Sequence, residues 1–193
     1  MNNKRVILAC FSALLAVSCK TALFGYKVVD INGMIYDFSN RPIPYCDISL
    51  GEKYNSITDI NGRFTVSKVP LGKYTIIGSK KGFETYVGEI FINDNKQIIY
   101  IRIPSQSQLL EKVEGALTDN DFTVAEEILE RAYRIDQNNI EVLFYYATVA
   151  FRQHEYDRAI AFLETAKRLG SKDIYVDKFL AVLKEIKNVE QTD

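Results

Sequence analysis

The feature that most constrains the fold is a 34-residue internal repeat in the second half of the chain. When the sequence is compared with itself at this offset, small and apolar residues fall on residues of similar character. The matched positions are Leu109 and Leu143, Val113 and Ala147, Ala116 and Ala150, Phe122 and Tyr156, Ala125 and Ala159, Leu129 and Leu163, Ala132 and Ala166, and Ile135 and Leu169. A period of this length is that of a paired-helix unit, which buries its apolar face only by stacking on neighbours.

The repeat predicts helices over 108–118, 123–135, 140–153 and 156–169. A last helix over 174–190 continues the phase, with Ala181 in the slot of Ala147, and is expected to cap the stack. In period and residue types, region 106–190 resembles the tetratricopeptide repeat family. The resemblance implies an α-helical TPR-like array of two helical hairpins plus a capping helix that binds another protein. Because about three units are typically needed for stability, we expect this short array to lean on the preceding domain, on a partner or on a second copy.

The first helix of each pair lines the concave face in this family. On this chain the resemblance places six side chains there that we predict to form a partner-binding groove: Phe144, Thr148, Phe151, Arg152, Tyr175 and Lys178. An apolar strip flanked by two cations suits a peptide or a helix. The alternative interpretation is that the aromatic residues pack against the preceding domain.

The region 26–104 has the pattern of an all-β domain. Short β-branched and aromatic runs alternate with polar residues, for example Cys46, Ile48 and Leu50, and Gly, Pro, Asn and Asp separate the runs. About seven strands are expected, which is the size of a small β-sandwich. A polar stretch at 104–108 separates this region from the helices.

Five turn signatures in this region occur in a recognisable order. They are Gly33-Met34-Ile35, Pro42 to Cys46, Thr58 to Phe64, Val69 to Tyr74, and Lys81 to Phe83. Their order resembles the carboxypeptidase regulatory-like domain, a transthyretin-like fold. The resemblance implies a seven-stranded prealbumin-like β-sandwich and no particular activity. The expected fold class is therefore multidomain, β followed by α.

The first 18 residues are predicted to form an export signal. Lys4 and Arg5 precede an apolar run too short to span a bilayer, which needs about 20 residues. The run closes on Leu14-Leu15-Ala16-Val17-Ser18-Cys19, which resembles a bacterial lipoprotein signal. The resemblance implies cleavage before Cys19, acylation of Cys19, and a protein held in the bacterial cell envelope at the outer membrane or its periplasmic face. Plain secretory cleavage and an uncleaved anchor are the alternatives.

Residues 19–25 would then form a short tether. The seven residues from Lys20 to Tyr26 reach at most about 25 Å when extended, so the β-domain is expected to lie close to the membrane. With acylation at Cys19 and removal of Cys10, only Cys46 remains, and no internal disulfide is expected.

Other functional classes find little support. The formal net charge is −1 and no basic stripe is present, which argues against nucleic acid as a partner. The single histidine, His154, has no nearby metal-ligating companion, and no phosphate loop or nucleophile elbow occurs. We therefore expect no metal, no cofactor and no enzymatic activity, and an unidentified envelope protein or peptide as partner. The alternative function is a glycan- or small-ligand-binding sandwich that uses Tyr45, Tyr54, Tyr86 and Tyr100.

Overall fold

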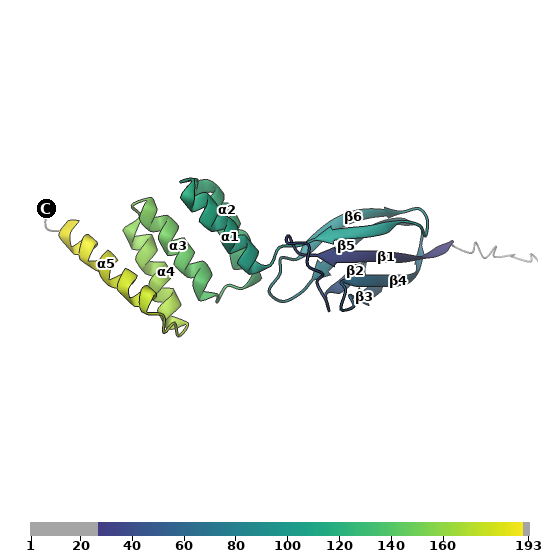
Figure 1. The fold of residues 1–193 in the computed structure, drawn as a ribbon, viewed down its shortest axis with the longest axis horizontal. Coiled ribbons are helices and arrows are strands. Elements are labelled where there is room, and N and C mark those ends of the chain that lie inside the picture. The colour runs from purple at the N-terminus through teal and green to yellow at the C-terminus, as the bar shows by residue number, and fades with distance from the viewer. Residues whose placement is uncertain (1–26, 191–193) are drawn as a thin grey trace, which may run out of the picture.

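The computed structural model describes residues 27–190. Figure 1 shows an elongated molecule in which seven strands are followed along the long axis by five helices. The strands form two sheets and the helices form a TPR-like array, as the sequence predicted. The predicted signal, Cys19 and the tether fall before residue 27, outside the described residues. Within residues 27–190, no helix combines the length and apolar character needed to cross a membrane.

The first sheet has three strands in the order β4-β1-β7. Strand β1 (Val28–Tyr36) pairs antiparallel with β4 (Arg63–Pro70) and parallel with β7 (Ile98–Arg102). Gly33 lies opposite Phe64 in this sheet. A Cβ on Gly33 would lie 2.2 Å from the Cζ atom of Phe64 and 2.9 Å from the carbonyl oxygen of Ile99, so a side chain here requires both the ring and the backbone to shift.

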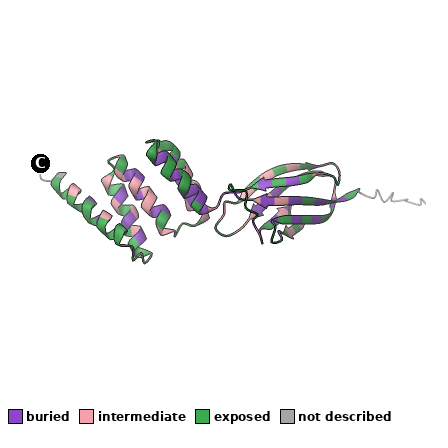
Figure 2. Ribbon diagram, viewed as in Figure 1, coloured by how far each residue is buried: buried purple, intermediate pink, exposed green. Residues whose placement is uncertain are grey.

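The second sheet has four antiparallel strands in the order β3-β2-β5-β6. They are β2 (Asp47–Leu50), β3 (Tyr54–Ile57), β5 (Gly72–Ser79) and β6 (Tyr86–Ile92). Most strands alternate buried and exposed residues, as Figure 2 shows, because successive side chains point to opposite faces of a sheet. The buried faces enclose a core rich in isoleucine, including Ile31, Ile35, Ile48 and Ile101.

Cys46 belongs to this core and is completely buried. Its Sγ lies 3.4 Å from the carbonyl oxygen of Ser79, and it is a free thiol. Burial raises the pKa of the Cys46 thiol to about 11. The residue therefore acts as a small apolar core residue, as expected from its place in the strand pattern.

The helices are α1 (Gln106–Thr118), α2 (Phe122–Ile135), α3 (Ile140–Arg152), α4 (Tyr156–Arg168) and α5 (Ile174–Glu190). Helix α1 begins two residues earlier than predicted because Ser105 caps it. The Ser105 side chain accepts from the Gln108 amide, and the Gln108 side chain accepts from the Ser105 amide. This reciprocal capping box fixes the start of the array directly after the last strand.

The 34-residue repeat is also visible in the backbone. Asn120 and His154 both take left-handed conformations, with φ of 58° and 63°. One residue further on, the amides of Asp121 and Glu155 each donate to a carbonyl five residues earlier at 2.8 Å. The two hairpins therefore turn in the same way, and His154 is the turn residue equivalent to Asn120.

The repeated alanines lie where the helices meet. Ala125 and Ala132 are fully buried in the first helical core, and Ala147, Ala159 and Ala166 in the second. Helix α5 closes the second core with Val176, Leu180 and Leu183. Ala181 is exposed, although it occupies the slot of the buried Ala147, because no described helix packs on that side of α5.

Candidate partner-binding surface and interdomain junction

The two predicted groove phenylalanines, Phe144 and Phe151 of α3, both pack against Phe179 of α5. The rings of Phe144 and Phe151 lie 5.7 Å and 5.4 Å from the ring of Phe179, both edge-on. Phe151 also lies 6.2 Å from the ring of Tyr156. Both phenylalanines are half-buried. Their ring contacts are thus with residues of the array, and the groove stays a prediction.

Two further residues of the predicted groove, Thr148 and Arg152, contact other residues of the array. The Thr148 hydroxyl donates to the carbonyl oxygen of Phe144 at 2.9 Å. Arg152 is exposed, donates to the Asn120 side chain and lies 5.7 Å from the centre of the Phe122 ring. Arg152 therefore links the end of α3 to the turn between α1 and α2.

The last two groove residues point to solvent from α5. Tyr175 is 67% exposed, and Lys178 is exposed and makes no ion pair with any residue from 27 to 190. Nearby, Val182 is 49% exposed. Of the six predicted residues, Arg152, Tyr175 and Lys178 are exposed and the other three are half-buried.

The tyrosines considered for a glycan platform do not share one environment. Tyr54 and Tyr86 pack against the sandwich core. Tyr45 lies in the loop before β2 and Tyr100 lies on β7 of the other sheet, each 66% exposed. The structure therefore leaves two separate exposed tyrosines rather than a continuous aromatic surface of four.

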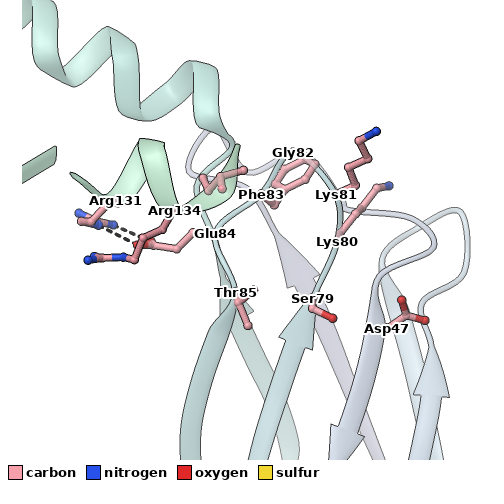
Figure 3. Close-up of a pocket in the computed structure, with 11 residues that line it drawn as sticks. Asp47, Ser79, Lys80, Lys81, Gly82, Phe83, Glu84, Thr85, Arg131 and Arg134 are labelled. Atoms are coloured by element: carbon pink, nitrogen blue, oxygen red, sulfur yellow. Dashed lines mark hydrogen bonds and ion pairs between the residues drawn. The ribbon is translucent and has the colours of Figure 1, made fainter. Parts of the chain in front are cut away.

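A bidentate ion pair joins the sandwich to the array (Figure 3). Arg131 of α2 donates from Nε and Nη2 to the two carboxylate oxygens of Glu84, at 2.8 Å and 2.7 Å. The hydrogen bonds from Arg131 lower the pKa of the Glu84 carboxyl, against a smaller opposing effect of burial. Such a paired fork restricts both side chains and so fixes how α2 lies relative to the sheet.

Backbone and side-chain contacts extend this junction. The Glu84 and Gln106 amides donate across it to the carbonyls of Pro104 and Gly82, at 3.0 Å and 2.9 Å. Gln108 donates from Nε2 to the Ser39 hydroxyl at 2.9 Å. Lys112 Nζ lies 4.5 Å from the centre of the Phe38 ring. These partners lie far apart in the sequence and no motif marked them, so the sequence named the preceding domain as one of three supports for the array but predicted none of these contacts.

An open pocket of about 660 Å³ lies at this junction. Its lining includes four cations, Lys80, Lys81, Arg131 and Arg134, together with Asp47 and Glu84. Arg131 is paired with Glu84, and Arg134 with Glu130. Lys80 and Lys81 form no ion pair with a residue from 27 to 190, so the lining keeps a net positive charge. No group of three His, Cys, Asp or Glu side chains within residues 27–190 could hold a metal ion.

Fold and surface together define a two-part protein, a seven-stranded β-sandwich followed by a tetratricopeptide-like array. Comparison with protein families agrees. Residues 31–114 match the family described as CarboxypepD_reg-like domain, and residues 116–183 match the family described as Tetratricopeptide repeat. Neither is a catalytic family, and the second indicates a protein-interaction scaffold.

A comparison with curated proteins gave no match. Among solved structures, the chain is similar to two interface mutants of a type II cohesin–X-dockerin complex from Acetivibrio cellulolyticus. The C-terminal interface mutant shares 18% identity over 46% of this chain and 72% of that chain, with a TM-score of 0.36. The N-terminal interface mutant shares 19% identity over 46% and 73%, with a TM-score of 0.32. At TM-scores this low, the likenesses carry no conclusion about fold or function.

Proposed function

We propose that this chain is a lipid-anchored protein of the bacterial cell envelope whose helical array binds another envelope protein. The observation that carries the proposal is the array itself, which matches the tetratricopeptide family over 116–183. Its last described helix also presents Tyr175, 67% exposed, at a position that faces partners in that family. The β-sandwich serves as a spacer and docking module.

The anchor rests on the sequence around Cys19, and the arrangement of the domains is compatible with it. Strand β1 begins at the end of the sandwich remote from the helices (Figure 1). An acyl chain at Cys19, a few residues before β1, would hold that end near the membrane. The helical array would then project away from the bilayer, where other envelope proteins are accessible.

Metabolic labelling with palmitate tests the anchor. The Cys19→Ser variant should lose the label and leave the membrane fraction as a folded protein. Cys10→Ser is the matched control, because it removes a cysteine from the same segment without touching the acylation position, and it should label and fractionate normally. Membrane retention of Cys19→Ser would show that another part of the chain holds the envelope.

Affinity capture from detergent-solubilised envelopes tests the binding surface. Tyr175→Ala removes an exposed ring from the array and should reduce recovery of a specific partner. Tyr100→Ala is the matched control, because it removes a ring of nearly the same exposure, 66%, from the sandwich. Equal recovery with both variants would contradict a binding surface at Tyr175.

A further inference from the structure

Helix α5 has two opposite faces of different character. Val176, Leu180 and Leu183 are buried against the preceding hairpin. The opposite face carries Ile174, 58% exposed, Val182, 49% exposed, and the exposed Ala181. In α3 the residue equivalent to Ala181, Ala147, is completely covered. An exposed apolar stripe on a helix that is otherwise well packed marks an interaction surface.

Two charged residues lie within this stripe. Lys178 and Glu185 are both exposed, and neither forms an ion pair with a residue in the described part of the chain. They stand seven residues apart, two turns along the same face, which separates their backbones by roughly 10 Å along the helix axis. They therefore do not pair with each other within one helix, where ion pairs form between residues three or four positions apart.

The stripe has an internal symmetry. Its centre falls between Ala181 and Val182, with Lys178 three residues before Ala181 and Glu185 three residues after Val182. Ile174 and Val189 stand at equal distances further out, and Val189 is 57% exposed. Reversing the direction of the helix therefore exchanges lysine for glutamate and apolar residues for apolar residues. A surface that is complementary to its own reversed copy suits a two-fold symmetric contact.

We propose that α5 pairs in antiparallel orientation with α5 of a second copy of this chain. Lys178 of each copy then lies level with Glu185 of the other, which gives two symmetric ion pairs. The small side chain of Ala181 near the axis lets the two helices approach closely. A parallel pair would instead place Lys178 against Lys178, so charge selects the antiparallel arrangement.

The size of the surface sets the strength of this contact. Helix α5 has 17 residues and is about 25 Å long, so one helix pair belongs with the small interfaces below about 1,200 Å². We therefore expect a weak, reversible dimer, whose specificity comes from the two ion pairs. The second copy covers α5, which also carries Tyr175 and Lys178 of the predicted groove, but the observations that support the dimer do not include the partner-binding function proposed above.

Cysteine cross-linking of the full chain in intact cells tests the contact. Ala181→Cys places a thiol near the proposed two-fold axis and should give a covalent dimer above the level of the unmodified chain, which has its own cysteines. In that background, Lys178→Glu or Glu185→Lys sets like charges against each other at both ends. Each single change should lower the dimer yield by about tenfold or more.

A double charge swap tests whether the helix that packs on α5 belongs to a second copy of this chain. The double variant Lys178→Glu/Glu185→Lys rebuilds both ion pairs only if the opposing helix carries the same two changes, so it should restore the dimer. Lys172→Glu, the same change of charge just outside α5, is the matched control and should have no effect. Failure of the double variant to restore the dimer, absence of a dimer with Ala181→Cys, or an adduct with a different protein instead would each overturn the proposal. Affinity capture of a partner, with and without Tyr175→Ala, is a separate experiment. Its result does not decide whether the dimer forms.

Discussion

The repeated alanines predict how sensitive the array is to side-chain volume. Ala159 of α4 is completely buried in the same core cluster as Ala147 and Leu163. Ala159→Leu adds three carbon atoms at a completely buried position where two helices meet. Overpacking of this kind costs about 1–3 kcal/mol. For a domain of this size, 1 kcal/mol corresponds to roughly 4–8 °C in melting temperature, so about 2 kcal/mol lowers the transition of the array by roughly 8–16 °C.

The same helix offers a matched control. Ala161, two residues further along, is exposed, and Ala161→Leu adds the same atoms to its solvent side. Because leucine is nearly as good a helix former as alanine, we expect a change within about 0.5 kcal/mol. Thermal melts followed by circular dichroism at 222 nm report on the helices. Equal melting temperatures for the two variants would refute the explanation that the alanines are required for close helix packing.

Three further predictions concern single sites. Arg131 holds the pKa of Glu84 below its ordinary value of about 4.3. The stabilisation by this ion pair is therefore complete above that value and is lost as pH falls through the lower pKa of the folded protein. Glu84→Gln should therefore destabilise by about 1 kcal/mol at pH 7, and urea melts at descending pH should show the difference vanish. The Cys46 thiol, with its pKa raised to about 11, should not react with a thiol reagent at pH 8 until denaturant is added; rapid labelling of the native protein at Cys46, located by peptide mass spectrometry, would contradict its burial. Ser105→Ala should cost about 1 kcal/mol through loss of the α1 cap, measured against Ser107→Ala in the same melts.

Local patterns predicted most of the fold. The alternation of Cys46, Ile48 and Leu50 predicted a strand with one buried face, and all three are buried. The 34-residue offset predicted helices whose ends agree with the structure to within two residues. Both succeed because burial follows the periodicity of the element and the repeat imposes that periodicity twice.

The surface was harder to predict because it depends on contacts between distant elements. The groove predicted from the family resemblance stays a prediction, but the contact of Phe144 and Phe151 with the ring of Phe179 on α5 could not be predicted from it. The junction pair Glu84 and Arg131 lies 47 residues apart and follows no sequence rule. The symmetry of α5 could be read only once the exposed face of the helix was known.

The measurement that tests the account most directly is photo-cross-linking in living cells from the concave face of the array. Glu141 is exposed near the start of α3 and stands 34 residues before Tyr175, at the equivalent position of the repeat. It is replaced by a photoreactive phenylalanine analogue, and the same analogue at the exposed Tyr100 of the sandwich is the control. The account predicts a discrete adduct with another envelope protein from position 141 and none from position 100. No adduct from position 141, or the same adducts from both positions, would contradict a partner-binding array.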